Sequence, residues 1–217
     1  PFFTVRELLR IQSGYFGTLS ARRLHDMITV GFGMRYLTDE AAPARLLKPI
    51  QHVVPRAAFE QLLFLYTARA HSVLADFVRE VYWPAYAAGK PAIGNDESLH
   101  FIEQAVRDGK TTTVWSPTMV KRMSSNLTSC CADFGLLERG ARRVRKILPF
   151  RIEPLAVTVL AYDLHDAGLG DNQLLVHPDW GLFGLERDDV LAEVRRTSLN
   201  RALIVQAAAG ITRINWT

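Results

Sequence analysis

The chain has 217 residues, of which 48% are hydrophobic and 22% are charged. It can therefore bury a core without disulfide or metal cross-links, as one large domain or two to three small modules, and disorder over most of its length is excluded. The net charge of +4 raises the expectation of a nucleic-acid or anionic-membrane partner. This excess is local: between Trp115 and Arg151 eight Lys and Arg stand against two acidic residues, a balance of +6, and the remainder carries −2.

The two cysteines, Cys130 and Cys131, are adjacent in sequence. Neighbouring cysteines rarely reach disulfide geometry, so a disulfide scaffold is excluded and a reducing cytosol fits. Two thiols without nearby histidines also fall short of a zinc site, and buried apolar side chains on a helix are the preferred interpretation. The longest apolar stretches, Pro154–Tyr162 and Ala202–Ile211, are too short to span a membrane. We expect a cytoplasmic protein with no membrane partner and no cofactor.

Four helices are predicted in the N-terminal part: Val5–Gln12, Ser20–Val30, Thr38–Leu47 and Arg56–Tyr82. Ser20 is a suitable N-cap for the second helix, and Gly31 and Gly33 are expected to end it. The third helix is expected to stop before Pro49. The fourth is the longest, because apolar residues recur at the spacing of one helix face throughout it.

Two further helices follow, Glu97–Arg107 and Pro117–Asp133. Ser116 is placed to cap the second of them, and Pro117 is tolerated at its first position because no N–H is needed there. Gly135 is the expected stop.

A basic hairpin is predicted next, from Leu136–Glu138 and Arg142–Ile152. In the second strand the even positions Val144, Leu148, Phe150 and Ile152 are apolar, and the odd positions Arg143, Arg145 and Arg151 are cationic. Such alternation is typical of a half-buried antiparallel strand, with the cations facing solvent. Helix, turn, helix and basic hairpin is the order of a winged helix-turn-helix unit.

In the last third of the chain we predict helices at Pro154–Asp166 and Glu186–Leu199. A terminal hairpin of Ala202–Gln206 and Thr212–Trp216 is expected to follow them. The expected fold is mainly α, with a small antiparallel β hairpin in a winged-helix-like unit. Its expected divisions are an N-terminal helical bundle (1–93), the winged helix-turn-helix-like unit (94–152) and a C-terminal helical segment with a terminal hairpin (153–217).

The candidate DNA-binding residues are those of the second helix and the hairpin that carry cations or short hydroxyls. They are Thr118, Lys121, Arg122, Ser125, Arg139, Arg142, Arg143, Arg145, Lys146 and Arg151. The helix residues would enter or border a groove and the hairpin cations would neutralise phosphates. A solvated surface strand, an acidic partner protein or acidic lipids are the competing interpretations of the same charge.

An enzyme is the weaker alternative. Carboxylates and imidazoles that could hold a divalent metal for hydrolysis occur at Asp163, His165, Asp166, Asp171, His177 and Asp179. Their spacing matches no metal motif, and turn or helix-end chemistry accounts for several of them. The chain also has no G-x-S-x-G elbow and no Walker loop.

Three stretches resemble the BrxA family, small components of bacterial BREX phage-defence systems. They are the run from Leu62–Tyr66 to Leu74–Val81, the run from Val114–Thr118 to Ala132–Glu138, and the closing Arg213–Trp216. The resemblance implies a mainly helical, cytoplasmic, non-enzymatic protein that binds DNA and has a NusB-like helical fold. No DNA-contact residue is carried over from the family.

The expected function is sequence-tolerant binding of double-stranded DNA, without catalysis, in a phage-defence system together with other defence proteins. A protein–protein scaffold whose basic strand meets an acidic partner is the first alternative. A metal-dependent hydrolase is the second.

Overall fold

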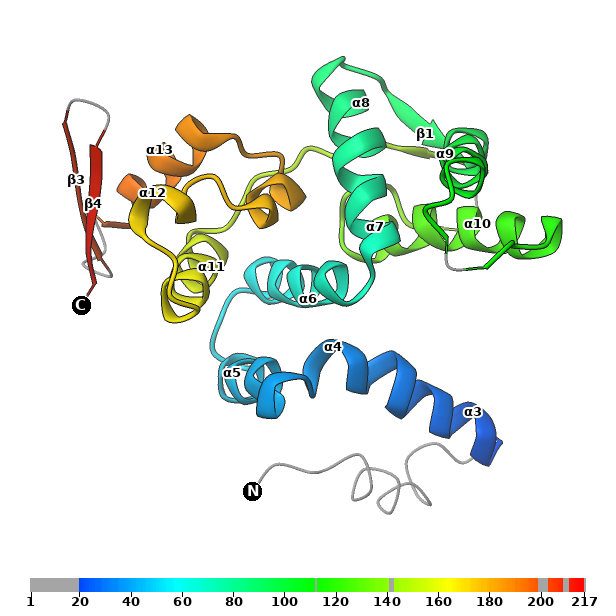
Figure 1. The fold of residues 1–217 in the computed structure, drawn as a ribbon, viewed down its shortest axis with the longest axis horizontal. Helices are drawn as coiled ribbons and strands as arrows, with labels where there is room; N and C mark the ends of the chain where they lie inside the picture. Colours follow the sequence, from blue (N-terminus) through cyan, green and yellow to red (C-terminus); the bar gives the residue numbers. More distant parts are fainter. Residues whose placement is uncertain (1–19, 112, 141–142, 199–202, 209–210, 217) are drawn as a thin grey trace. The chain divides into compact units, whose positions relative to one another are not determined.

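The computed structural model describes residues 20–111, 113–140, 143–198, 203–208 and 211–216. The chain divides into two compact units, Pro1–His71 and Ser72–Thr217, and each is described by itself (Figure 1). The described residues are mainly helical, with two small two-stranded antiparallel sheets, which confirms the predicted fold class. The predicted helix Val5–Gln12 lies outside the described residues. The predicted division into three segments stays a prediction.

The first unit begins with one continuous helical rod made of α3 (Ala21–Asp26), the π-helical η1 (Met27–Gly33) and α4 (Met34–Tyr36). Ser20 caps it as predicted, because its hydroxyl accepts a hydrogen bond from the Arg23 amide at 3.3 Å. The predicted interruption at the two glycines is wrong. Glycine lowers helix propensity by about 1 kcal/mol but does not prevent a helix, and here the rod widens into a π turn and continues.

The helix predicted at Thr38–Leu47 is present with different limits, as η2 (Asp39–Ala41) followed by α5 (Ala42–Ile50). Its predicted end before Pro49 is wrong, because Pro49 lies inside α5. A proline one residue from the end of a helix removes only one backbone hydrogen bond, so the last turn tolerates it.

The single long helix predicted over Arg56–Tyr82 is also wrong, because it breaks at His71. There the backbone takes φ −132° and ψ 87°, which ends α6 (Arg56–Ala70). The second unit then starts with α7 (Ser72–Phe77), the π-helical η3 (Val78–Tyr82) and α8 (Trp83–Ala87). The break is also the boundary between the two units.

Within the second unit, β1 (Ala92–Gly94) leads into α9 (Asn95–Arg107), which packs against α10 (Pro117–Asp133) (Figure 1). Strand β2 (Val144–Lys146) pairs antiparallel with β1, with Ile93 opposite Arg145. An antiparallel bridge between Leu137 and Ile147 confirms the pairing of the predicted hairpin. Its predicted second strand, Arg142–Ile152, is too long, because the regular strand is limited to Val144–Lys146. Strand β1, the partner of β2 in this two-stranded sheet, was not predicted from the sequence pattern.

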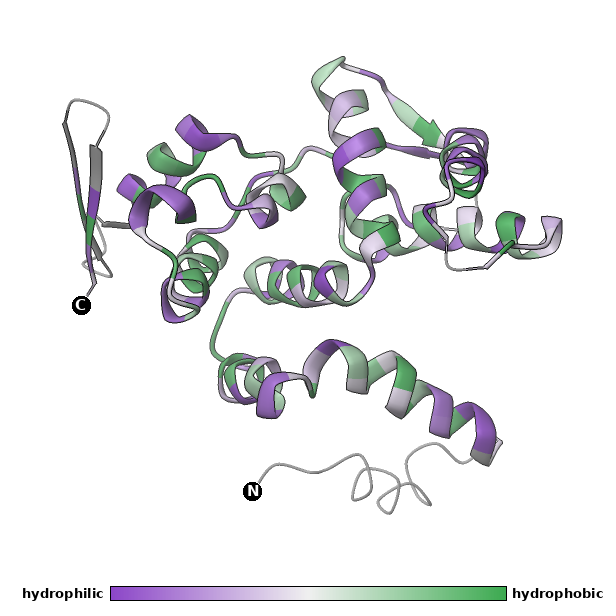
Figure 2. Ribbon diagram, in the orientation of Figure 1, coloured by the Kyte–Doolittle hydropathy of each residue, from purple (hydrophilic) through white to green (hydrophobic). Residues whose placement is uncertain are grey.

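The C-terminal part contains α11 (Pro154–Asp166), α12 (Asp171–Leu174), η4 (Pro178–Phe183) and α13 (Arg187–Ser198). The predicted terminal hairpin is present as β3 (Leu203–Ala208) and β4 (Ile211–Trp216). Helix α11 is largely hydrophobic (Figure 2) and buries its face from Ala156 to Leu164. The Trp216 ring stacks on His165 with centroids 4.1 Å apart, and the Ile214 amide donates to Asp171 Oδ2 at 2.9 Å. These contacts hold the hairpin against α11 and α12.

No helix in the part of the chain that the structure describes is both long and apolar enough to cross a membrane.

Candidate nucleic-acid interface

The N-terminal half of α10 presents one polar stripe. Ser116 caps the helix as predicted, since its hydroxyl accepts from the Met119 amide at 3.3 Å, and Pro117 occupies the first turn. The stripe consists of the predicted site residues of this helix, all of them exposed: Thr118, Lys121, Arg122 and Ser125. They are spaced at three, four and seven residues, so they share a face. The opposite face is buried from Val120 to Cys131.

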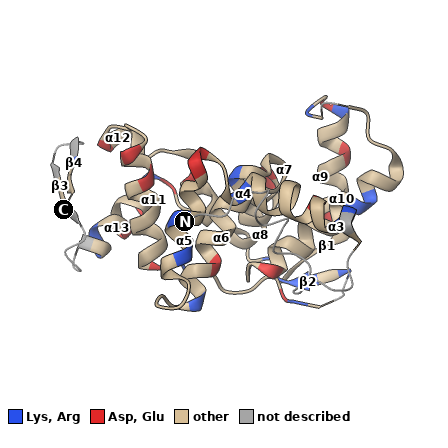
Figure 3. Ribbon diagram, turned by 90° about the horizontal axis from the view of Figure 1, so that it is seen from below, with Lys and Arg blue, Asp and Glu red and all other residues tan. Residues whose placement is uncertain are grey.

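The second group of predicted site residues lies on β2 and on the chain just before and after it. Arg143, Lys146 and Arg151 are exposed, and Arg142 lies outside the described residues. The backbone at Arg143 is held, because its carbonyl accepts a hydrogen bond from the Asn95 amide at 2.8 Å. Asn95 in turn accepts from the Thr128 hydroxyl at 3.0 Å, which joins the start of α9 to α10. Lys and Arg residues occur on both α10 and β2 in Figure 3.

The predicted exposure pattern of this strand is wrong at two neighbouring residues. Arg145 was expected to face solvent but is only 6% exposed, and Val144 was expected to be buried but is 60% exposed. Arg145 is buried because the inner side of the strand offers hydrogen-bond acceptors to its guanidinium. The Arg145 guanidinium reaches Ser129 Oγ on α10 at 3.1 Å and the Glu138 carbonyl at 3.2 Å, and these acceptors offset the cost of burial.

Arg139 is exposed, yet its donors are directed at α10. Its Nη2 donates to the Asp133 carbonyl at 3.0 Å and its Nε to the Ala132 carbonyl at 3.4 Å. These carbonyls belong to the last turn of α10, where a helix has unsatisfied acceptors and a partial negative charge. The main role of Arg139 is therefore to cap the C-terminus of α10.

The predicted site residues thus fall into two groups. The outward-facing group consists of Thr118, Lys121, Arg122, Ser125, Arg143, Lys146 and Arg151. Arg139 and Arg145 bind carbonyl or hydroxyl oxygens of the protein itself. This division cannot be predicted from the sequence. The oxygens that accept from Arg139 and Arg145 belong to the end of α10 and to a turn, and their positions depend on the fold.

The alternative Asp and His cluster is dispersed. His165 stacks on Trp216 and Asp171 accepts from a β4 amide, whereas His177 and Asp179 belong to η4 and its cap. Among the described residues, no group of three or more His, Cys, Asp or Glu side chains lies close enough to hold a metal ion.

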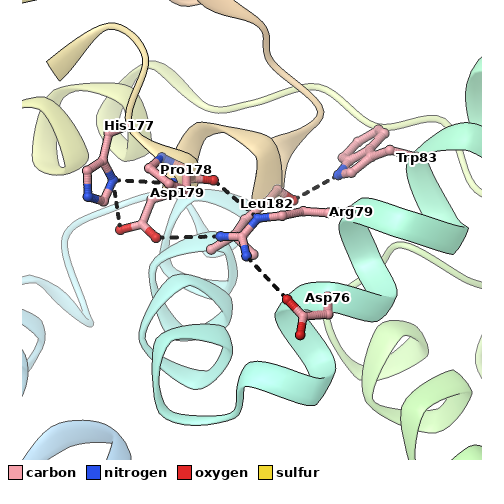
Figure 4. Close-up of polar contacts among 7 residues, drawn as sticks. All are labelled: Asp76, Arg79, Trp83, His177, Pro178, Asp179 and Leu182. Carbon is pink, nitrogen blue, oxygen red and sulfur yellow. Dashed lines mark hydrogen bonds and ion pairs between the residues drawn. The ribbon is translucent and has the colours of Figure 1, made fainter. Parts of the chain in front are cut away.

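Asp179 and His177 instead join a network centred on Arg79, a residue that the sequence did not single out (Figure 4). Arg79 Nε donates to the Pro178 carbonyl at 3.2 Å, and its Nη2 lies 3.8 Å from Asp179 Oδ1. His177 Nδ1 lies 3.5 Å from the other Asp179 oxygen. The network ties η4 to η3 and borders a hollow of about 750 Å³ whose lining includes Trp83. It is a structural link between helices.

Of the two cysteines, Cys131 has the predicted buried position and Cys130 is only half-buried. Cys131 is fully buried in α10, and burial raises the pKa of its thiol far above the usual range. A thiol that stays protonated is a poor nucleophile and a poor metal ligand.

Comparison with known proteins indicates the family of this chain. Neither the curated proteins nor the solved structures contain a chain that matches this one. The model of the BrxA family matches residues 35–163, more than half of the chain, which covers α10 and the basic hairpin but not the closing Arg213–Trp216. The chain therefore belongs to the BrxA family and is a component of a bacterial BREX phage-defence system.

Proposed function

We propose that this protein binds double-stranded DNA without sequence preference and without catalysis, as a cytoplasmic component of BREX defence. The observation that carries the proposal is the outward-facing group of cations on α10 and on and beside β2, together with the exposed residues Thr118 and Ser125. Short polar side chains and cations contact phosphates readily, and phosphate contacts carry no sequence information.

The order of elements supports the proposal. Helix α8, strand β1, helices α9 and α10, the strand segment Leu136–Glu138 and β2 follow one another as in a winged helix-turn-helix unit. The pairing of β1 with β2 is the pairing between the first strand and the second wing strand of such a unit. In that geometry the third helix enters the major groove and the wing follows the flanking backbone. We assign these two roles to α10 and to the hairpin strand β2.

The exposed cations give the expected strength of the electrostatic contribution. Five of them face outward in the described residues: Lys121, Arg122, Arg143, Lys146 and Arg151. Each neutralised phosphate contributes about −0.9 to the slope of log K against log salt concentration, so full engagement gives about −4.5.

The test is duplex binding by fluorescence anisotropy over a salt series. We expect R143E/K146E to lose at least tenfold in affinity and to flatten the slope by about two. R22E/R23E is the matched control, since it makes the same charge change at two exposed residues of α3 and should bind nearly as the wild type does. Absence of duplex binding by the wild type, or equal losses in the two variants, would overturn the proposal.

One observation favours the scaffold alternative. Val144 is 60% exposed and lies in sequence between the exposed cations Arg143 and Lys146, and Val114 before α10 is 93% exposed. Apolar side chains within a charged rim suit a protein partner more than a phosphate backbone. The substitution V144S separates the two functions, because it should leave DNA affinity within twofold and weaken capture of an acidic partner from the same defence system.

A further inference from the structure

Arg145 is buried, at 6% exposed, whereas the other predicted site cations that the structure describes are exposed. One guanidinium nitrogen donates to the carbonyls of Glu138 and Gly140, and the other donates to Ser129 Oγ at 3.1 Å. Its Nε is buried without a hydrogen-bond partner. Among the residues that the structure describes, no carboxylate pairs with this buried charge.

Burying an arginine in this way is costly, and a hydrocarbon side chain would fill the same space more cheaply. The acceptors around Arg145 are a hydroxyl on the penultimate turn of α10 and two carbonyls of the hairpin turn. The acceptors lie on two segments, α10 and the hairpin turn, and Arg145 itself lies on a third, β2. The Arg145 guanidinium presents its N–H donors in a rigid, planar arrangement, so its hydrogen bonds fix the relative positions of these segments. A hydrocarbon side chain could not do this, because it makes no directional contacts.

The neighbours of Arg145 are the exposed cations of the strand. Arg143 and Lys146 lie two residues before it and one residue after it, and both are exposed. The backbone of the hairpin around them is paired through the Glu138 amide, which donates to the Lys146 carbonyl at 2.8 Å. The place of both cations relative to the polar stripe of α10 therefore depends on how the hairpin is held to that helix.

We propose that Arg145 is the positioning residue of the hairpin: through Ser129, Glu138 and Gly140 it holds β2 against α10, so that Arg143 and Lys146 meet the phosphates that flank the groove. Arg145 itself does not contact DNA. This inference rests on the proposed function, because it assigns the role to a DNA-binding hairpin.

The binding test compares R145Q, R143Q/K146Q and the triple variant over the same salt series. We expect R145Q to flatten the slope by about two, as R143Q/K146Q does, although it removes only one charge. The triple variant should then be no weaker than R143Q/K146Q, since the hairpin has already lost its contacts. Effects that add, with R145Q flattening the slope by about one, would make Arg145 a direct phosphate contact and overturn the proposal. A wild-type slope in R145Q would overturn it as well.

A second measurement needs no DNA and keeps the two proposals separate. S129A removes one acceptor and keeps every charge, and it also serves if R145Q folds poorly. We expect amide exchange at Glu138 and Leu148 to become at least tenfold faster in S129A, and to stay at the wild-type rate in R143Q/K146Q. Unchanged exchange in S129A would refute the positioning role. If the wild type does not bind DNA, the proposed function fails, but the exchange comparison still decides whether Arg145 holds the hairpin.

Discussion

Substitution of Gly184 by alanine should be one of the most damaging single changes in the second unit. Gly184 ends η4 with φ 69°, in the left-handed region. An added Cβ there would lie 2.6 Å from Cδ2 and Cε3 of Trp83. The left-handed backbone alone costs a non-glycine residue about 1–2 kcal/mol. The overlap adds a separate packing cost, which in well-packed cores is about 1–3 kcal/mol.

The Trp83 ring has little room to yield. Its Nε1 donates to the Leu182 carbonyl at 3.0 Å, and its ring has edge-to-face contacts with Tyr82, Tyr86 and Phe150. We therefore expect G184A to lower the free energy of unfolding by about 2–5 kcal/mol, the sum of the two costs.

Gly89 provides a matched control. Its φ is 68°, but an added Cβ would meet no atom within 4 Å. G89A should therefore lose only the backbone cost of about 1–2 kcal/mol. Urea unfolding followed by tryptophan fluorescence and far-ultraviolet circular dichroism measures both variants. Equal losses in G89A and G184A would refute the steric argument. So would a G184A loss that stays the same when Trp83 is replaced by leucine, because that replacement removes the overlapping ring atoms.

Three further outcomes are expected. Burial, and secondarily the charge of Arg35, lower the pKa of His71, so the neutral ring is favoured in the fold and stability falls as the pH drops below about 6.5. Chemical unfolding between pH 5 and 8 should show this slope, and H71Q should reduce it; an identical slope would contradict the assignment. S116A should cost α10 about 1 kcal/mol in urea unfolding through loss of its N-cap, and a neutral result would mean that Pro117 alone starts the helix. Cys131 should resist iodoacetamide in the native protein at pH 8 and react only after unfolding, and rapid native labelling by mass spectrometry would show that its site opens.

The break at His71 shows what periodicity leaves out. The helical pattern of apolar residues continues from Phe59 to Val81 without a proline or glycine, so every local signal favours one helix. The structure ends α6 at His71, whose Nε2 accepts a hydrogen bond from Arg35 Nε at 3.1 Å. That partner lies 36 residues earlier in the chain, and its contribution is tertiary. The caps at Ser20 and Ser116 could be predicted because their hydrogen bonds are local.

Strand β1 was missed for a similar reason. Ala92, Ile93 and Gly94 are too few to show an alternating pattern, and their strand exists because β2 pairs with them across 52 residues. Gly94 is opposite Val144, and a Cβ at Gly94 would lie 3.4 Å from the Val144 side chain. A strand of three residues is defined by its partner, and its own sequence carries almost no signal.

The number of cations available to contact DNA differs between the sequence and the structure, and this difference changes the expected salt dependence of binding. The sequence counts eight cations between Trp115 and Arg151 as equivalent, and full engagement of all eight would give a salt slope of about −7. The structure assigns the donors of Arg139 and Arg145 to the protein's own oxygens, which leaves five outward-facing cations among the described residues and a slope of about −4.5. Counting Arg142, which lies outside the described residues, changes the second value only to about −5.4. A measured slope near −7 would therefore mean that Arg139 and Arg145 leave their internal acceptors and contact phosphates when DNA binds. The hairpin would then change its conformation on binding.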